Sequence, residues 1–390
     1  MKILLVSTVY PNPDKPTFGV FVHEQAKQLT KLGMDVRVIC PISITPPRRL
    51  LKLKKGILSE WKSWILSIWN TPKESTLEGI KVFYPRWVLS TKILEAPTCF
   101  FSKKRFLHRI WRDWSWDVVH AHFLTPNGIL GKQIAKQYGI GIPLVISCLG
   151  DDLFLYAKRK TICNSVKSAL DSSGAIICKS QQLLEEVMKY GVDPERVHVI
   201  YNGCNLVEFK TSNIDQLDEI LFIGHFIERK CVGYLIEAFR NLKNKKVKLR
   251  LVGDGELLPQ IKKTVYDYAL QDRVIFEGTV PHSLLPDYIN RAKLLCLPSR
   301  SEGTPNVVME ALACGTPVVA SKVGGVPGIV PSFCGVLVPP QDVISLQQAL
   351  DEALKRDWDY QAIRTHAEQN LSSEAQCKKI VEIYRETSLN

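Results

Sequence analysis

The sequence predicts an α/β protein of two Rossmann-like domains, each a doubly wound parallel sheet, that face a central cleft. Its 390 residues are too many for one ordinary core and sufficient for two domains of about 150–200 residues each. Short β-rich runs alternate with helical patterns along the chain, which is typical of parallel strands joined by crossover helices. The residues best suited to chemistry directly follow predicted strands, where such sheets bind ligands.

The first domain is predicted over residues 1–205. Its strands are expected at Lys2–Ser7, Asp35–Cys40, Val118–His120, Leu144–Ser147, Ala175–Cys178 and Val197–Ile200. The apolar spacing of Val20–Leu32 predicts a helix, for which Gly33 is suited as the C-cap. The run Met1–Ser7 is too short, and too soon followed by proline, for a signal peptide. We therefore expect it to form the buried first strand.

Residues 46–116 form a basic, tryptophan-rich insert in this domain. They hold 15 Lys and Arg against 5 Asp and Glu, so they carry +10 of the net charge of +12, and they contain seven of the eight tryptophans. Within the insert, Ile57–Trp69 has the pattern of an amphipathic helix downstream of the basic run Arg48–Lys55. This combination predicts attachment to an anionic membrane surface and not to nucleic acid. The alternative is a helix docked on the first domain's own core.

The second domain is predicted over residues 206–370, and its first residues, to about residue 218, form a polar linker. Its strands are expected at Ile220–Gly224, Leu249–Gly253, Val274–Phe276, Leu294–Pro298 and Val318–Ser321. From about Val343 onward the pattern is helical. We expect residues 371–390 to form a C-terminal helix that packs back on the first domain.

The cysteines and the apolar runs indicate the compartment. None of the eleven cysteines forms a C-x-x-C pair, and several lie in apolar, strand-like runs. We therefore expect buried thiols in a reducing compartment rather than disulfides or a zinc site. No apolar run approaches the roughly 20 residues that span a bilayer. These features predict a cytoplasmic protein, peripheral at the inner face of the cell membrane.

The sharpest motif is the segment 302–310, E-G-T-P-N-V-V-M-E, which directly follows the predicted strand Leu294–Pro298. Thr304 is expected as the N-cap of a helix and Pro305 as its first residue. The loop thereby brings a helix N-terminus, which favours anions, to the end of the sheet. The alternative is ordinary capping, with Glu302 as a first-turn acid and Glu310 as a surface residue.

The Glu-x7-Glu pattern resembles the signature of the family 4 retaining glycosyltransferases of the two-domain B fold, the type that builds bacterial cell-surface polysaccharides. Five further segments resemble that family in the same order along the chain: Gly19–Glu24, Asp117–His122, Val199–Gly203, Leu251–Gly255 and Phe276–Pro281. The resemblance thus covers nearly the whole chain. It implies transfer of a sugar from a UDP- or GDP-sugar to a glycan or lipid-linked acceptor, with retention of the anomeric configuration.

The resemblance also implies roles for individual residues. Glu302 would bind hydroxyls of the donor sugar, and Glu310 would bind the ribose diol, which suits a carboxylate because it accepts twice. His122, near the reaction centre, would form the catalytic pair with Glu302, while His120 would be structural. The other donor contacts implied are Gly19, Gly278, Thr279, Val280, Gly303, Thr304, Pro305 and Asn306.

The phosphate-binding segment departs from the family pattern, which is G-R-x-x-x-x-K-G. Residues 224–231 have the sequence G-H-F-I-E-R-K-C, so Lys230 fits while His225 replaces the arginine. A histidine cannot form the bidentate fork of a guanidinium. Arg229 would either compensate for this loss or be a solvated surface residue.

Two other positions limit what the resemblance implies. Gly328 stands where the family usually has glutamate, so no acid or base role is expected there. Asp151 and Asp152 lie in a segment that loosely resembles the family's H-G-x-D loop. They would either contact acceptor hydroxyls or cap a helix.

No metal or other cofactor is expected, because no Asp-x-Asp follows a strand and cationic side chains would neutralise the leaving group. The expected partners are a nucleotide-sugar donor, a glycan or lipid-linked acceptor and an anionic membrane surface, with no nucleic acid. Two other functions stay open at this point. One is a nucleotide-sugar epimerase of the same fold class, and the other is a non-enzymatic membrane-surface protein that uses only the Trp/Lys segment.

Overall fold

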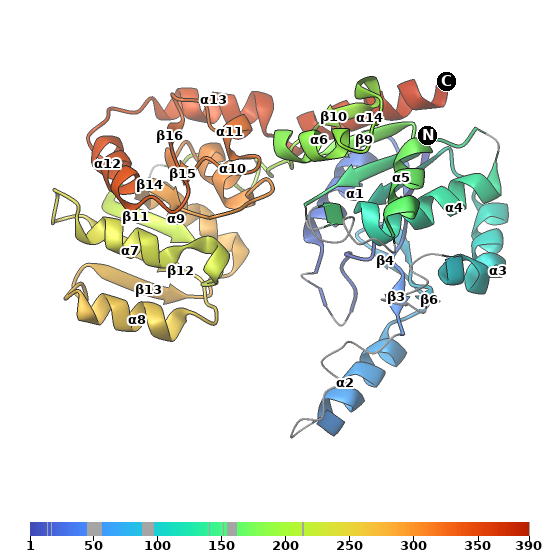
Figure 1. Cartoon of the computed structure of the whole chain (residues 1–390), viewed down its shortest axis with the longest axis horizontal. Coiled ribbons are helices and arrows are strands. Elements are labelled where there is room, and N and C mark those ends of the chain that lie inside the picture. The colour runs from blue at the N-terminus through green and yellow to red at the C-terminus, as the bar shows by residue number, and fades with distance from the viewer. Residues whose placement is uncertain are drawn as a thin grey trace. The chain divides into compact units, whose positions relative to one another are not determined.

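The computed structural model describes residues 1–13, 15–16, 18–44, 57–87, 97–139, 141–150, 152–153, 162–212 and 214–389. The chain forms two compact units (Figure 1). Unit 1 comprises Met1–Lys179, Leu183–Ile200 and Cys377–Asn390, and unit 2 comprises Ser180–Gln182 and Tyr201–Gln376. The chain thus enters unit 2 at Tyr201, a few residues before the position assigned from sequence, and its C-terminal segment belongs to unit 1.

Unit 1 is built on an eight-stranded sheet in the order β10-β9-β8-β7-β1-β2-β5-β4. All neighbouring strands are parallel except β4 and β5, which are antiparallel. The strands are β1 Lys2–Val6, β2 Asp35–Ile39, β4 Glu74–Leu77, β5 Ile80–Phe83, β7 Val118–His122, β8 Leu144–Cys148, β9 Ala175–Cys178 and β10 Val197–Val199. Every residue of β7 and β8 is buried, as expected for central strands that are covered on both faces.

Helices cover both faces of this sheet. They are α1 Val20–Lys31, α3 Pro97–Asp113, α4 Ile129–Tyr138, α5 Cys163–Asp171, α6 Gln181–Met188 and α14 Ser373–Leu389. On one face, residues of α3 to α6 share an apolar cluster with Leu4 and Val6 of β1. On the other face, α1 and α14 pack against Ile3 and Leu5, so the C-terminal helix completes the core of unit 1. Its Tyr384 is fully buried there.

The tryptophan-rich insert contains strands that the sequence analysis did not predict. β4 and β5 form a hairpin through Glu78 and Gly79, both with positive φ, and β5 extends the main sheet beside β2. Two short parallel strands, β3 Ile42–Ser43 and β6 Arg86–Trp87, form a separate pair. All of these strands are short, and β4, β5 and β6 lie within a segment that was interpreted by its charge, which is why the sequence analysis missed them.

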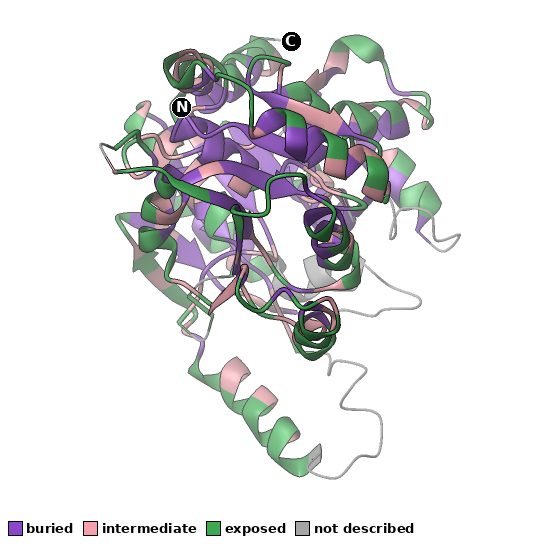
Figure 2. Cartoon of the chain, turned by 90° about the vertical axis from the view of Figure 1, so that its left-hand side faces the viewer, coloured by how far each residue is buried: buried purple, intermediate pink, exposed green. Residues whose placement is uncertain are grey.

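The tryptophans of the insert fall into two groups. Trp87, Trp114 and Trp116 are buried in the apolar core of unit 1. Trp69 lies on α2 Ile57–Asn70, a helix on which no residue from 58 to 70 is buried (Figure 2). The tryptophan enrichment of the insert therefore reflects core packing in part, which corrects its interpretation as one membrane-facing segment. The basic run Arg48–Lys55 lies outside the described residues.

Unit 2 has a six-stranded, fully parallel sheet in the order β13-β12-β11-β14-β15-β16. Numbered along the chain, this is the 3-2-1-4-5-6 order of the Rossmann fold. Its strands are β11 Leu217–Ile223, β12 Lys248–Val252, β13 Val274–Gly278, β14 Ala292–Leu297, β15 Val318–Ser321 and β16 Gly335–Val338. The sequence analysis did not predict β16, a four-residue strand at the edge of the sheet.

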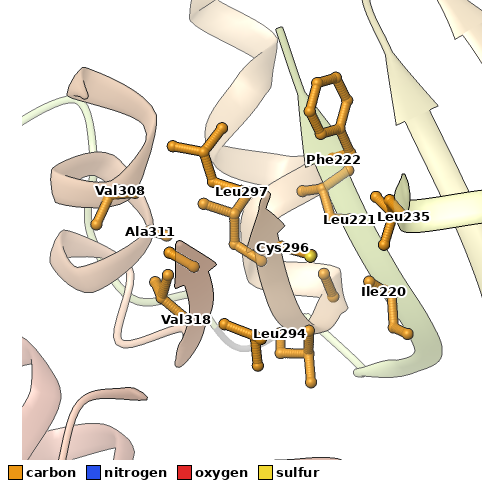
Figure 3. Packing of buried hydrophobic residues seen from close by; sticks show 14 of the residues in the cluster. Ile220, Leu221, Phe222, Leu235, Leu294, Cys296, Leu297, Val308, Ala311 and Val318 are labelled. Atoms are coloured by element: carbon orange, nitrogen blue, oxygen red, sulfur yellow. The ribbon is translucent and has the colours of Figure 1, made fainter. Parts of the chain in front are cut away.

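The helices of unit 2 pack on this sheet around one apolar core. They are α7 Val232–Arg240, α8 Leu258–Asp267, α9 Leu285–Arg291, α10 Asn306–Ala313, α11 Val326–Ile329, α12 Val343–Ala353 and α13 Tyr360–Asn370. Figure 3 shows side chains of β11, β14, β15 and α10 in one apolar cluster, among them Phe222, Leu297, Val318 and Val308. The helix that carries the Glu-x7-Glu motif is thereby fixed on the centre of the sheet.

The strand order reverses once in each sheet, between β1 and β7 in unit 1 and between β11 and β14 in unit 2. Ligands of open α/β sheets bind beyond the carboxyl ends of the strands at such a point, because the flanking loops diverge there. In unit 2, the loops that follow β11 and β14 carry Lys230 and Glu302. In unit 1, the loop after β1 leads to Gly19, and β7 ends at His122.

Candidate functional site

Glu302, Lys230 and Arg229 form an ion-paired cluster at the switch point of unit 2. The Lys230 Nζ lies 2.6 Å from Oε1 of Glu302, and a guanidinium nitrogen of Arg229 lies 3.0 Å from Oε2. The Glu302 side chain is only 6% exposed, so its charge depends on these two cations more than on water. Two positive charges against one negative charge leave the cluster with a net charge that favours an anion.

The contacts of Arg229 argue against one of the two roles left open by the sequence. Its guanidinium also donates to the backbone oxygen of Ser301 at 2.8 Å, so it is anchored to the Glu302 loop although the side chain is 44% exposed. Arg229 is therefore not merely a solvated surface residue. His225 is exposed, and within the described ranges no hydrogen bond or ion pair involves its side chain.

The backbone of the Glu302 loop is held by a neighbouring glycine turn. Gly324 has a φ of 55°, and a Cβ at this position would lie 1.8 Å from the backbone oxygen of Glu302. The next amide, of Gly325, donates to the oxygen of Gly303 at 2.6 Å. Only glycine tolerates both the left-handed backbone and this close approach. Residues 324–325 thus fix the position of the backbone that carries the Glu302 side chain.

The motif helix α10 begins one residue later than the sequence analysis expected. Pro305 is the N-cap, with a ψ of 116°, and Asn306 is the first helical residue. The assignment of Thr304 as N-cap was wrong, because the extended ψ of Pro305 keeps the proline outside the helix. Thr304 is buried, while Asn306 is exposed at the helix N-terminus. The amide of Val308 donates to the backbone oxygen of Pro305 at 3.2 Å, which leaves the amides of Asn306 and Val307, at the very start of the helix, without an intrahelical acceptor and favourable for an anion.

Glu310 lies on α10 and is buried to 7% exposure, so it is not the surface residue of the capping interpretation. Its Oε1 lies 3.1 Å from Nε2 of His282, and Nδ1 of the same ring lies 3.1 Å from Oε1 of Glu208. The hydrogen bond to Glu310 is the main cause that raises the pKa of His282 to about 9. The sequence analysis missed His282, although the segment 276–281 that it quoted ends directly before this residue.

The loop Gly278–Val280 begins at the last residue of β13. Gly278 has a φ of 73°, and its backbone oxygen accepts from the amide of Gly253 at 2.7 Å. Thr279 is exposed and Val280 is partly buried against the core. Because His282 comes two residues after Val280, this loop and Glu310 are adjacent in unit 2.

In unit 1, His120 and His122 lie on one face of β7 with their rings stacked 4.5 Å apart. His120 has two partners, the hydroxyls of Tyr384 at 2.5 Å and Ser147 at 2.8 Å. Nδ1 of His122 has no hydrogen-bond partner in the part of the chain that the structure describes, and Nε2 lies 3.5 Å from the amide nitrogen of Gln25. Burial, and next the charge of Lys179, lowers the pKa of His122 to about 3, so its ring is neutral.

Gly19 is the N-cap of α1 and has a φ of 77°. A Cβ there would lie 2.5 Å from the backbone of Val9, in the loop after β1. The glycine therefore lets the start of α1 pack directly on that loop. This places Gly19 at the switch point of unit 1.

The carboxylate of Asp152 is buried and fully engaged by backbone groups. Oδ1 accepts from the amides of Leu149 and Gly150, at 3.1 and 2.8 Å, and Oδ2 accepts from the amide of Leu124 at 2.7 Å. Burial raises the pKa of this carboxyl, against the effect of these hydrogen bonds. The contacts favour the capping interpretation over acceptor binding. Asp151 lies outside the described residues.

Gly328, where the resembling family has glutamate, lies against Tyr201. A Cβ on Gly328 would lie 1.8 Å from the phenol oxygen of Tyr201. Tyr201 belongs to the segment Val199–Gly203, whose sequence V-I-Y-N-G resembles the family's V-I-P-N-G pattern but has tyrosine in place of proline. The two departures are thus in contact, and the tyrosine occupies the space that a side chain at residue 328 would need.

Comparisons with known proteins agree with this arrangement. A family model described as glycosyltransferase family 4 matches residues 18–208, and one described as glycosyl transferases group 1 matches residues 207–370. TuaC of Bacillus subtilis strain 168, a glycosyltransferase assigned to teichuronic acid biosynthesis, is 31% identical over 384 residues, covering 91% of this chain and 89% of TuaC. The chain is a family 4 glycosyltransferase of the GT-B fold.

Other relatives of this glycosyltransferase differ in what they act on. The N-acetyl-alpha-D-glucosaminyl L-malate synthase of Bacillus anthracis is 24% identical over 399 residues, covering 98% of this chain and 96% of the relative. The crystal structure of HepE from Anabaena in complex with UDP has a TM-score of 0.72 at 17% identity and covers 99% of this chain and 100% of HepE. The structural similarity establishes the GT-B fold, while the family membership establishes sugar transfer.

The structure also bears on membrane and metal binding. In the described ranges, no helix combines the length and apolar character that a membrane span requires. Among the same residues, no group of three or more His, Cys, Asp or Glu side chains is placed to hold a metal ion. Ten cysteines are described as free thiols, and all of them except Cys163 are buried.

Proposed function

We propose that this enzyme transfers a hexose-type unit from a UDP- or GDP-sugar to a glycan or lipid-linked acceptor, with retention of the anomeric configuration, in cell-surface polysaccharide synthesis. The ion-paired cluster of Glu302, Lys230 and Arg229 at the switch point of unit 2 carries the proposal. Support comes from the UDP complex of HepE and from the teichuronic acid role assigned to TuaC.

The donor would bind to unit 2. As the bond between the anomeric carbon and the phosphate oxygen breaks, negative charge grows on the departing nucleoside diphosphate. Lys230 and Arg229 would turn from Glu302 towards this charge, aided by the N–H groups of Gly303 and Thr304 before α10 and of Asn306 at its start. The freed carboxylate of Glu302 would then accept hydrogen bonds from hydroxyls of the donor sugar.

The nucleoside would lie farther along the same edge of the sheet. Glu310 would accept from the ribose diol, and the loop Gly278–Val280 would contact the base through main-chain groups. The buried position of Glu310 supports this role, since a carboxylate with low solvent access gains more from a ligand's hydroxyls. No resident metal is part of the proposal, because the two cations supply the charge.

The acceptor would bind near the switch point of unit 1. His122 would stand closest to the reaction, since its ring is neutral and one nitrogen has no partner among the described residues. A neutral imidazole donates from one nitrogen and accepts at the other, so it can orient a hydroxyl. Gly19 would let the loop after β1 approach the diphosphate.

The test combines binding with turnover. A thermal-shift screen with UDP, GDP and their sugars identifies the donor, since a ligand at 100 times its Kd stabilises the fold by roughly 2.7 kcal/mol. Turnover is then measured with and without a polysaccharide or lipid-linked acceptor. Glu302→Gln should keep the fold and reduce turnover strongly, while Glu310→Gln should mainly raise the donor KM. Sugar isomerisation without an acceptor would instead identify an epimerase, and full turnover by Glu302→Gln would refute the proposal.

We further propose that α2 attaches the enzyme to an anionic bilayer, where lipid-linked acceptors reside. Leu58 and Trp69 are 82% and 80% exposed, and Ile65 and Leu66 are also exposed, so the helix is not docked on the core of unit 1 (Figure 2). Exposed apolar side chains on a helix that follows the basic run of residues 48–55 in the sequence fit a bilayer interface, where apolar chains lie below anionic headgroups.

Vesicle co-sedimentation tests this attachment. Binding should require anionic lipid, weaken with salt and fall when Leu58 and Trp69 are both replaced by serine. Leu389→Ser is a matched control, because Leu389 is an equally exposed apolar residue, at 87%, on α14. Equal recovery in the supernatant with neutral and anionic vesicles at low salt would exclude the proposal.

A further inference from the structure

The side chain of His282 joins two carboxylates that come from different parts of unit 2. Glu310 is contributed by α10, and Glu208 is contributed by the turn that precedes Phe209. The Phe209 ring stands edge-on to the imidazole, with centroids 5.2 Å apart, and restricts how the histidine can rotate. The charged groups that face the ring are thus the two glutamates, one at each nitrogen.

The contacts define the protonation state of this histidine. Ionised carboxylates only accept hydrogen bonds, so both ring nitrogens must carry a proton for both contacts to form. His282 is therefore an imidazolium that donates twice. Neighbouring carboxylates stabilise this form, and the pKa of His282 is raised to about 9.

The engagement of Glu310 is one-sided. Within the described residues, its carboxylate has a single hydrogen-bond partner, His282, and this bond uses Oε1. Rotation about the last side-chain bond of a glutamate is otherwise broad. The bond to His282 selects one orientation of the carboxylate and leaves Oε2 available to a ligand.

Resting on the function proposed above, we propose that His282 is a positioning residue for nucleotide recognition: it holds the Glu310 carboxylate in the orientation that receives the ribose hydroxyls of the nucleoside diphosphate. Glu208 assists by holding the far side of the ring. The histidine follows the base-contacting loop by two residues, so base and ribose recognition are linked through it. His282 itself need not touch the nucleotide.

The test uses nucleotides that differ only in the ribose diol. Calorimetry gives the Kd of UDP and of 2′,3′-dideoxy-UDP, with GDP and its dideoxy analogue in parallel, for the full-length enzyme and its variants. His282→Ala should weaken binding of the natural nucleotide about fivefold, the size expected of a charge-assisted hydrogen bond that solvent partly screens. Binding of the dideoxy analogue should not change. His282→Gln, which keeps an N–H donor, should restore part of the preference for ribose.

His366→Ala is the matched control. This residue is also in unit 2 and also stands edge-on to a phenylalanine, Phe333, but it bonds to the backbone oxygen of Ile329 rather than to a carboxylate. It should leave both Kd values unchanged. A pH series adds a second readout: the preference for UDP over its dideoxy analogue should decline as pH rises through about 9 in the wild type and stay flat in His282→Ala. Both nucleotides carry the same base, so titration of that base affects the two Kd values equally and cancels in their ratio.

Glu310→Gln distinguishes a failure of the positioning role of His282 from a failure of the ribose-binding role of Glu310. If this variant loses the preference for the ribose diol while His282→Ala keeps it, the positioning role is wrong and the assignment of Glu310 stands. If Glu310→Gln also keeps the preference, the ribose is bound elsewhere and both ideas fall. Equal weakening of natural and dideoxy nucleotides by His282→Ala would show a general structural role and would likewise overturn the inference.

Discussion

Replacement of Lys230 by alanine is the most direct test of how the enzyme neutralises its leaving group. In the structure, Nζ of Lys230 lies 2.6 Å from Glu302 with only 13% of its side chain exposed, so its charge is poorly screened by water. The variant lowers the net charge of the cluster from +1 to zero. Loss of one preorganised donor to a developing oxyanion costs about 2–4 kcal/mol in the transition state.

This cost corresponds to a decrease in kcat/KM of about 30- to 900-fold. Arg229→Ala should cost less, about tenfold, because the arginine is 44% exposed and solvent screens its charge. The assay is kcat/KM for the donor at saturating acceptor, with the melting temperature measured for each variant to separate misfolding from lost catalysis.

The double variant, with both Lys230 and Arg229 replaced by alanine, supplies the control. Because Lys230 and Arg229 contact the same carboxylate, their effects on kcat/KM should not be additive. Additive losses, or a Lys230→Ala enzyme that keeps kcat/KM within about threefold of the wild type, would refute the assignment of this cluster to the leaving group. His225→Arg should be tolerated, since the histidine is exposed and its side chain makes no hydrogen bond or ion pair among the described residues.

Three further predictions follow from other parts of the structure. Gly328→Glu should lower the melting temperature, because the new Cβ would collide with the phenol of Tyr201. Tyr201→Pro in the same chain should restore part of this loss. If the two substitutions instead lower the melting temperature additively, the steric explanation is wrong. Turnover should persist in EDTA, and full inactivation that Mg²⁺ reverses would show that a metal shares the work of Lys230. The free energy of unfolding of unit 1, followed by tryptophan fluorescence, should fall as pH drops below about 6.5, by up to about 1.4 kcal/mol per pH unit for each of His120 and His122. Burial depresses the pKa of both rings in the fold, so the unfolded chain takes up protons first; His122→Asn should reduce this slope, and an unchanged slope would exclude the histidine as its source.

Local signals in the sequence were sufficient to predict most of the strands and helices and their order along the chain. Alternating apolar runs predicted the central strands of both sheets, because buried parallel strands need continuous apolar residues. The glycine and proline around the Glu-x7-Glu motif predicted a loop that leads into a helix after β14. The errors are where local signals are weak: short strands such as β6 and β16, and the start of α10, which the ψ of Pro305 moved by one residue.

The sequence by itself thus determined the alternation of strands and helices, the family and the set of polar residues at the strand ends. Only the tertiary structure decided which of these residues meet. Glu302 pairs with Lys230 and Arg229 across 72 and 73 residues, and His282 bonds to Glu208 across 74. Crossover connections bring the ends of strands distant in sequence to one edge of a sheet, so these contacts leave no periodic pattern along the chain. The physical reason is that hydrophobic periodicity reports which face of an element is buried, whereas the partner of a polar side chain depends on the order in which the strands assemble.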